Sequence, residues 1–290
     1  MKKKFLVGAM MVLLFSTYAN FPIHAEGQRD YATWLWNPWM IVHDEMGTLD
    51  FLETKQANKV YLQIDRDIPM QVYRNFIEKA SAKEIKIYAL DGAPDWVGPK
   101  GSTHQNKLLN WVGNYQSGSA DSQKFSGIHL DVEPYLYHGW STNQAATIRS
   151  YQTLLLKAKT SAASLKLPLE VDLPFWFDEI YYKNKYGKGN LAEWAIANTD
   201  GITIMAYRDT ASFIIDIVKN EIAFADKHGK NVIIGVETGR TDEGDQISFF
   251  EEGEAYMMKE LTSVNNYYDQ VKGYNGIAIH HVESWMNMKQ

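Results

Sequence analysis

Short runs of β-branched and aromatic residues alternate with longer segments of helical period along most of the chain, and this alternation constrains the fold more than any other feature. Eight such runs occur, at residues 32–36, 59–64, 85–90, 127–131, 169–173, 201–206, 231–236 and 276–280. Segments with the apolar period of a helix lie between them, among them 69–82, 143–164, 210–228 and 253–265. Eight strand and helix units in a chain of 290 residues predict an α/β fold, a single (β/α)8 TIM barrel.

The residues that follow the candidate strands differ in type from those that precede them. The preceding turns are mostly Lys, Asn, Gly and Ser. The residues that follow the strand ends are polar or aromatic: Asn37, Asp65, Asp91, Glu133, Pro174, Tyr207, Glu237 and His281. A doubly wound sheet is the competing fold, but its first strand normally leads into a glycine-rich turn, and here that turn reads Asn-Pro-Trp at 37–39. We therefore expect a barrel with its functional groups at the C-terminal mouth.

The first 25 residues have the pattern of an export signal. A lysine triplet at 2–4 precedes an apolar run at 5–15, and Ala25 is a small residue at which a signal peptidase could cleave. The run is too short to span a bilayer. The sequence therefore predicts a signal peptide at 1–25, a barrel at 26–290 and a secreted protein.

Charge and cysteine content exclude several classes of function. The chain has 29 basic and 35 acidic residues, and the predicted export signal removes three lysines and no acid. An acidic protein without a basic run is a poor match for a phosphate backbone. The absence of cysteine excludes disulfides, thiolate metal sites and cysteine nucleophiles. No second apolar run reaches transmembrane length, so we expect no membrane span. We also expect a monomer without a nucleic-acid partner.

The densest group of reactive side chains lies in the segment 125–135, which reads Phe-Ser-Gly-Ile-His-Leu-Asp-Val-Glu-Pro-Tyr. Alternation along a strand places His129, Asp131 and Glu133 on one face. Two carboxylates that lie close together repel each other, so we expect one of them to keep its proton near neutral pH. A protonated carboxyl beside an ionised one is what bond cleavage by proton donation requires. An ordinary salt bridge at a strand end is the alternative.

This segment resembles the fourth-strand signature of glycoside hydrolase family 18, the chitinases and endo-N-acetylglucosaminidases, which reads Asp-Gly-x-Asp-x-Asp-x-Glu. Gly127, Asp131 and Glu133 match that signature. Ser126 and His129 stand where the family has its first two aspartates. The resemblance implies a (β/α)8 barrel that acts on a carbohydrate substrate.

The resemblance extends to the sixth strand, where Met-Ala-Tyr at 205–207 is similar to the Met-x-Tyr of family 18. It implies that Glu133 is the general acid and that Asp131 orients a substrate acetamido group, which serves as the nucleophile. Tyr207 would support the same group. His129 would replace the lost upstream aspartate as the partner of Asp131.

A second resemblance involves two glutamates. Glu133-Pro134 at the fourth strand and Gly-Val-Glu-Thr-Gly at 235–239 are similar to the acid/base and nucleophile positions of the clan that includes the cellulases and β-glycosidases. This resemblance implies that Glu237 is the nucleophile. Val132 departs from the clan, which has asparagine there. A salt bridge at the rim is the alternative role for Glu237.

Several other side chains near the strand ends are candidates for contacts with a sugar: Trp36, Asp65, Asp91, His129, Trp176, His280 and Trp285. Trp285 follows the eighth strand, where such barrels often have the floor of the sugar site. Alternation puts His280 and His281 on opposite faces, so only one of them is expected to enter the barrel. Asp65 and Asp91 fit a turn or a helix cap equally well.

Seven of the nine tryptophans lie at or just beyond the predicted strand ends: Trp34, Trp36, Trp39, Trp96, Trp140, Trp176 and Trp285. A hydrophobic core alone would scatter tryptophans over strands and helices. Their crowding predicts flat aromatic platforms for sugar rings at the mouth. Packing of the loop bases is the alternative.

Sequence motifs for other catalytic chemistries are missing. The first strand has no His-x-His pair, and the chain has no His-Glu-x-x-His, Gly-x-Ser-x-Gly, P-loop or dinucleotide fingerprint. We therefore expect neither a metal nor a cofactor. A cation held by His129, Asp131, Glu237 and His280 is the alternative.

These features together predict a secreted glycoside hydrolase that cleaves a polysaccharide or glycan by general acid/base catalysis. Glu133 would donate the proton, Asp131 and Tyr207 would stabilise the charged centre, and Glu237 would be the second carboxylate. Two other functions stay open. The acidic mouth could hydrolyse amide bonds in cell-wall peptide or glycan, or the barrel could bind carbohydrate without cleaving it, since it lacks two acids of the family 18 signature.

Overall fold

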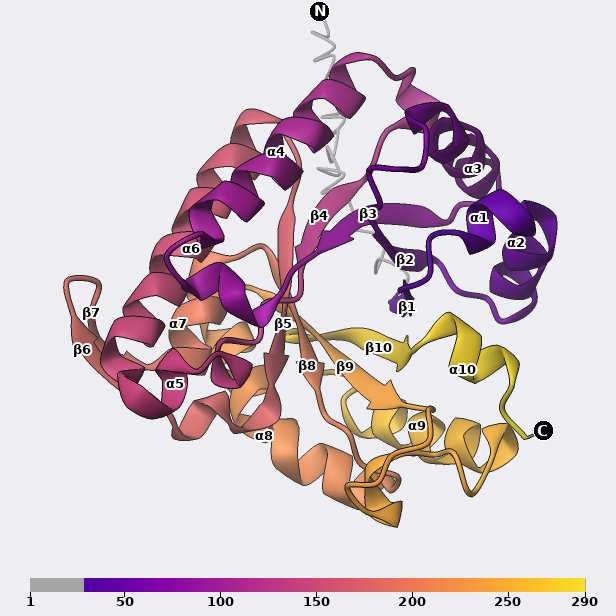
Figure 1. Ribbon diagram of the computed structural model, residues 1–290. Coiled ribbons are helices and arrows are strands. Elements are labelled where there is room, and N and C mark those ends of the chain that lie inside the picture. The colour runs from indigo at the N-terminus through magenta and orange to yellow at the C-terminus, as the bar shows by residue number, and fades with distance from the viewer. Residues whose placement is uncertain (1–28, 290) are drawn as a thin grey trace, which may run out of the picture.

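The computed structural model describes residues 29–289 and shows a closed barrel of parallel strands surrounded by helices (Figure 1). The strand order around the barrel is β1-β10-β9-β8-β5-β4-β3-β2. The strands are β1 (Asp30–Leu35), β2 (Lys59–Gln63), β3 (Lys86–Asp91), β4 (Gly127–Leu130), β5 (Leu169–Pro174), β8 (Gly201–Met205), β9 (Asn231–Glu237) and β10 (Tyr274–His280). The predicted (β/α)8 barrel is confirmed. The predicted signal peptide lies outside the described residues and stays a prediction.

Helices follow the strands in the order of a (β/α)8 barrel. They are α1 (Met40–His43), α2 (Glu45–Thr54), α3 (Met70–Ala82), α4 (Gly101–Ser117), α5 (Gly139–Thr142), α6 (Gln144–Ser164), α7 (Leu191–Asn198), α8 (Ala211–His228), α9 (Glu254–Tyr267) and α10 (Val282–Met286). A two-stranded antiparallel hairpin, β6 (Tyr181–Asn184) and β7 (Gly187–Asn190), projects from the loop between β5 and α7 (Figure 1). Within residues 29–289, no helix is long and apolar enough to cross a bilayer.

Side-chain alternation along the strands divides the core into two clusters. The smaller cluster fills the barrel interior and contains Ala32, Trp34, Tyr61, Tyr88, Leu90, Ile233 and Ala278. The larger cluster lies between the strands and the helices, where Ile128 and Leu130 of β4 are fully buried. Because successive residues of a strand point to opposite faces, His129 between them points into the barrel.

Local sequence signals determine where the helices begin and end. The Asn143 side chain accepts a hydrogen bond from the Ala146 backbone N–H at 3.2 Å, which caps the start of α6. The Asn190 side chain caps α7 in the same way, at 3.0 Å from the Glu193 backbone nitrogen. Helix α8 ends at Gly229, whose φ of 61° is a left-handed conformation that favours glycine.

A buried ion network closes the N-terminal end of the barrel. Lys59, 3% exposed, lies 2.5 Å from Asp30 Oδ2 and 2.9 Å from Glu170 Oε1. Burial alone would lower the pKa of Lys59, but the charges of Glu170 and Asp30 and their hydrogen bonds outweigh it, so the pKa rises. Strands β1, β2 and β5 are thereby joined by one ammonium group.

A buried carboxyl group on α8 makes stability depend on pH. Glu221 has no exposed surface, and neither of its carboxyl oxygens has a hydrogen-bond partner among the described residues. Burial, with a smaller contribution from the charge of Asp178, raises the pKa of Glu221 from 4.5 to about 8. The folded state keeps a proton that the unfolded state releases, so the free energy of unfolding falls as the pH rises between these two values.

Replacing Glu221 with glutamine is expected to remove this pH dependence. At pH 9 the variant should be more stable than the parent by on the order of 4 kcal/mol, while at pH 5 the two should be similar. Urea unfolding at both pH values measures the difference. An equal loss of stability in parent and variant between pH 5 and pH 9 would show that Glu221 does not titrate in the folded state.

Candidate active site

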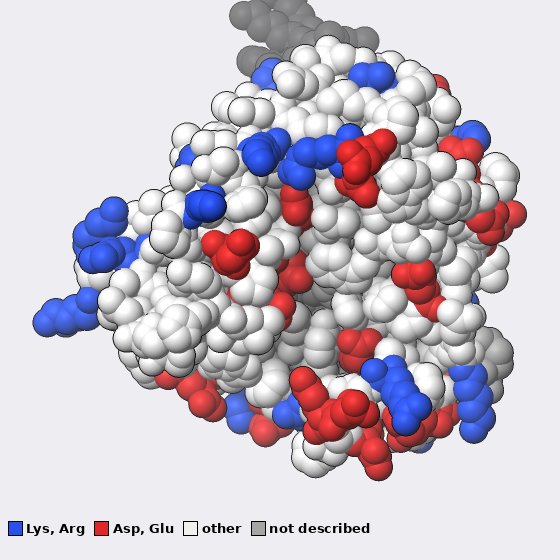
Figure 2. All heavy atoms as spheres, viewed as in Figure 1, with Lys and Arg blue, Asp and Glu red and all other residues white. Residues whose placement is uncertain are grey.

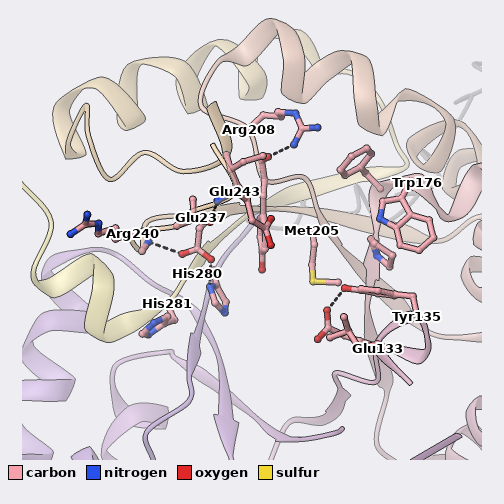
Figure 3. Close-up of a pocket in the computed structure, with 17 residues that line it drawn as sticks. Glu133, Tyr135, Trp176, Met205, Arg208, Glu237, Arg240, Glu243, His280 and His281 are labelled. Atoms are coloured by element: carbon pink, nitrogen blue, oxygen red, sulfur yellow. Dashed lines mark hydrogen bonds and ion pairs between the residues drawn. The ribbon is translucent and has the colours of Figure 1, made fainter. Parts of the chain in front are cut away.

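The loops after the strands form a cavity of about 500 Å³ at the C-terminal mouth of the barrel. It lies in the hollow near the centre of the face drawn in Figure 2, where acidic side chains gather. Residues from the loops after β4, β5, β8, β9 and β10 line the cavity: Glu133, Tyr135, Leu136, Pro174, Phe175, Trp176, Met205, Tyr207, Arg208, Glu237, Gly239, Arg240, Thr241, Glu243, Ile247, His280 and His281. Figure 3 shows Glu133 and Glu237 on opposite walls.

Glu133 follows β4 and has one carboxyl oxygen engaged. The Tyr135 hydroxyl donates a hydrogen bond to Glu133 Oε1 (Figure 3). Burial and the neighbouring negative charge raise the pKa of Tyr135, so its phenol keeps the proton that it donates. No second hydrogen bond to this carboxyl occurs within residues 29–289, which leaves Oε2 free for a ligand.

Two further carboxyl groups lie beneath Glu133 in the barrel. Burial, followed by the charges of Asp172 and Glu133, raises the pKa of Asp131 well above its ordinary value. Burial also raises the pKa of Asp172. Asp172 Oδ2 accepts a hydrogen bond from Trp34 Nε1 at 3.1 Å and lies 2.9 Å from His129 Nε2. The sequence predicted that one carboxyl of the pair Asp131 and Glu133 keeps its proton, and the pKa of Asp131 is shifted in that direction. Asp172 was not part of that prediction.

His129 is part of this buried layer and does not reach the mouth. The side chain is 0% exposed and stacks on the Tyr61 ring, with ring centroids 3.7 Å apart. Burial lowers its pKa to about 3, so the imidazole is neutral over the physiological range. Its prediction as a contact to the sugar is therefore wrong. The predicted pairing with Asp131 is also corrected, because the close neighbour of His129 Nε2 is Asp172.

Glu237 is held as an ionised carboxylate on the opposite wall. Its Oε1 accepts backbone N–H groups of Thr238 and Gly239 at 2.8 and 2.6 Å, and its Oε2 lies 2.7 Å from His280 Nδ1. Burial would raise the pKa of Glu237, but the hydrogen bond and charge interaction with His280, together with the two backbone donors, lower it. The sequence left open a role for Glu237 as a salt-bridge partner, and its partner is the His280 ring at hydrogen-bond distance.

Trp36 fixes the orientation of the His280 ring. The indole N–H donates to His280 Nε2 at 2.8 Å, and because an indole nitrogen is only a donor, Nε2 must accept. The hydrogen of the ring therefore lies on Nδ1 and points to Glu237. Both predicted sugar contacts thus use their polar atoms on each other, and they position the Glu237 carboxylate.

Tyr207 and Arg208 complete the wall after β8. Burial and the surrounding carboxylates raise the pKa of Tyr207 well above its usual value, so the phenol stays protonated. Its hydroxyl has no hydrogen-bond partner among the described residues and is available to a ligand. The Arg208 guanidinium lies 5.0 Å above the Phe175 ring and donates to the Tyr207 carbonyl.

Of the predicted site residues, the mouth brings together Glu133, Tyr207, Glu237, Trp176 and His280, with Asp131 beneath them. Five predicted sugar contacts lie outside the cavity lining: Trp36, Asp65, Asp91, His129 and Trp285. Asp65 accepts a hydrogen bond from Trp39 Nε1 at 3.0 Å, and Asp91 pairs with Arg66 at 3.0 Å. Their side chains are thus engaged in the loops after β2 and β3.

Trp285 is not the floor of the site. Its side chain is 1% exposed, and its Nε1 donates to Glu254 Oε1 at 3.0 Å. The ring packs edge-on against Tyr31 and Phe51, because α10 turns its apolar side toward β1 and α2. The predicted sugar contact is therefore wrong.

The predicted crowding of tryptophans at the mouth needs the same correction. Trp34 lies inside the barrel at 1% exposure, and Trp96 is buried below its loop. Only Trp176 among the seven lines the cavity. Packing of the barrel and the loop bases accounts for most of the others.

Some cavity residues were not predicted. His281 lines the cavity together with His280, because β10 ends at His280 and strand alternation no longer applies to the next residue. The peptide bond between these two histidines is cis. Tyr135, Arg240 and Glu243 also face the cavity, and their position in the loops after the strands was the one signal that could have indicated them.

Side chains that could ligate a metal are spread apart in the barrel. In the part of the chain from 29 to 289, no three His, Asp or Glu side chains come close enough to hold a cation together. The set His129, Asp131, Glu237 and His280, considered from the sequence, is divided between the buried layer and the far wall.

Comparison with known proteins relates this chain to solved structures at low identity. No family model and no curated protein sequence matches it. A chitinase from Bacteroides thetaiotaomicron has a TM-score of 0.57 and 10% identity, covering 89% of this chain and 90% of its own. The spore cortex-lytic enzyme SleL from Bacillus megaterium has a TM-score of 0.55 and 12% identity, and the match covers 90% of this chain and 73% of SleL. A chitinase from Chromobacterium violaceum has a TM-score of 0.54 and 12% identity, and the match covers 89% of this chain and 97% of that protein. The chain shares the (β/α)8 barrel fold of these proteins.

Proposed function

We propose that this chain is a secreted glycoside hydrolase that cleaves a polysaccharide or glycan by general acid/base catalysis at the barrel mouth. The observation that carries the proposal is the Glu133 carboxyl, which has one oxygen bound by Tyr135 and the other free to face the cavity. A carboxylic acid at the wall of a cleft, with other carboxyl groups nearby, is the arrangement that protonates a glycosidic oxygen.

The other groups supply charge stabilisation. Asp131 lies beneath Glu133 with a raised pKa, and the free Tyr207 hydroxyl can donate to a polar group of the substrate. In glycoside hydrolysis the transition state is positively charged at the sugar ring. The Glu237 carboxylate, which stays ionised at the cavity wall, favours that charge.

Glu237 is better suited to stabilise than to attack. Both of its oxygens already accept hydrogen bonds, from Thr238, Gly239 and His280. A nucleophile needs an oxygen free to approach the anomeric carbon. This favours the family 18 interpretation, in which the substrate's own acetamido group attacks, over the interpretation with two catalytic glutamates.

The structural neighbours agree with this proposal in chemical class. Two are described as chitinases and one as a spore cortex-lytic enzyme. Secretion is part of the proposal on the strength of the lysine triplet and apolar run before residue 26. A monomer is proposed because one chain contains every group described at the mouth.

A panel of glycans tests the proposal. Chitin, bacterial cell walls and plant polysaccharides are incubated with the chain from residue 26 onward, and new reducing ends are measured beside released amine and ammonia. New reducing ends on at least one substrate are the expected result. Amine or ammonia without reducing ends would identify an amidase. Tight oligosaccharide binding without any product would identify a barrel that only binds sugar.

A further inference from the structure

One side of the barrel has few acidic residues. The segments 96–120, 134–169 and 180–192 contain no Asp or Glu, although the chain has 35 of them. These segments supply α4, α5, α6 and the hairpin β6–β7, which lie on the same side of the barrel (Figure 1). In Figure 2, blue side chains gather on this side and few red ones are visible.

Seven cations on this side are available to a partner: Lys100, Lys107, Arg149, Lys157, Lys183, Lys185 and Lys188. All are exposed except Lys157, which is half-buried. None of the seven forms an ion pair with an acidic side chain in the described part of the chain. We call this set the basic face. Lys159 is not included, because it pairs with Asp200, and neither is Lys166, which follows the C-terminal end of α6, away from the mouth.

The basic face is one continuous surface. Asn184 of the hairpin donates to Gln152 Oε1 of α6 at 2.7 Å, and the Tyr186 hydroxyl lies 2.8 Å from Thr153 Oγ1. On α6, Arg149, Thr153 and Lys157 are spaced four residues apart and form one row. A groove of about 180 Å³ between α4 and α6 has Lys157 at its edge.

Aromatic side chains connect the basic face with the mouth. Trp176 lines the cavity, and the hairpin begins only five residues later at Tyr181. The Trp176 ring lies 5.0 Å from the Tyr135 ring on the cavity side. It also lies 6.2 Å from the Trp140 ring of α5, on the side of the basic face. Trp176 therefore lies between the cavity and α5, and the hairpin follows it closely in the chain.

We propose that the basic face binds an anionic polysaccharide and guides it to the barrel mouth. Seven unpaired cations repel one another, and a chain of carboxylates or phosphates relieves that repulsion while it is steered toward the cavity. The choice of a polysaccharide rests on the proposed function. A lipid surface is disfavoured, because α4 and α6 expose no large apolar side chain and the hairpin exposes only the amphipathic Tyr181 among the described residues.

Affinity for polygalacturonate tests this inference on the chain from residue 26 onward. Replacing Lys183, Lys185 and Lys188 with glutamine is expected to weaken binding about tenfold at about 0.05 M salt, and the difference should disappear at about 1 M. The control variant carries Lys86→Gln, Lys272→Gln and Lys289→Gln. These three lysines are exposed, unpaired in the described residues and outside the basic face, and their loss changes the net charge equally.

Further variants separate this inference from the proposed function. Arg149→Gln with Lys157→Gln weakens binding through α6 and leaves the hairpin intact. Glu133→Gln is expected to bind polygalacturonate like the parent, so a loss of hydrolysis alone does not affect the inference. Equal weakening by the control lysines would overturn it. So would equal binding of neutral dextran, or tighter binding of duplex DNA or phosphatidylglycerol vesicles than of polygalacturonate.

Discussion

Replacing Glu133 with glutamine is expected to lower kcat on any glycan that the protein cleaves by about 10²–10⁴-fold. The amide has the size of the carboxyl and can still accept the Tyr135 hydroxyl, but it has no acidic proton to give to the leaving oxygen. KM should change little, because the shape of the cavity is kept. The measurement is the rate of reducing-end release over a range of substrate concentrations.

The matched control for this variant is Glu243→Gln. Glu243 lines the same cavity but is exposed, and its loss removes the same charge from the mouth. We expect less than a threefold change in kcat for Glu243→Gln, since exposed charges act weakly through water. If Glu133→Gln kept the parental kcat, or if both variants lost it equally, Glu133 would not be the proton donor.

Replacing Lys59 with methionine is expected to lower the free energy of unfolding by about 3–5 kcal/mol. The ammonium of Lys59 is the cation between Asp30 and Glu170 at the closed end of the barrel. Without it, two carboxylates that are largely buried would face each other unpaired. Urea unfolding at pH 7 measures the loss.

Two comparisons show whether this loss comes from the buried charges. Lys79→Met breaks the exposed pair with Glu45 and is expected to cost about 0–1 kcal/mol. Adding Glu170→Gln to the Lys59 variant removes one stranded charge and should restore part of the stability. A Lys59 variant as stable as the Lys79 variant would show that the network does not hold β1, β2 and β5 together.

The barrel was predictable because each strand has a hydrophobic signal of its own. Most of the eight runs are largely apolar, as strands buried on both faces require. The runs 127–131 and 169–173 contain acids or histidine but keep an apolar residue at every second position. The hairpin β6–β7 was not predicted. Its residues, Tyr-Tyr-Lys-Asn at 181–184 and Gly-Lys-Gly-Asn at 187–190, are polar and glycine-rich, and the hairpin has no apolar face of its own.

The sequence could predict only those site residues that a strand end places at the mouth. Glu237 is the last residue of β9, and Glu133 and Tyr207 come within three residues of the ends of β4 and β8, so all three reach the mouth. Asp172 was missed as a partner of His129, because a strand buried on both faces gives no sign of which side chains point inward. Trp285 was misplaced, because the direction of a helix after a strand depends on packing that no local pattern encodes.

The hydrogen bond from Trp36 to His280 has a consequence for how the protein matures. It spans the seam where the first and last barrel strands pair, between residues 244 positions apart in the chain. Contacts this distant form late in folding, because the chain must first lose the entropy of a very large loop. Glu237 therefore gains its histidine partner only when the barrel closes. A nascent chain that already contains Glu133 has no finished mouth, so closure of the seam is the step that separates an inert polypeptide from one with a complete site.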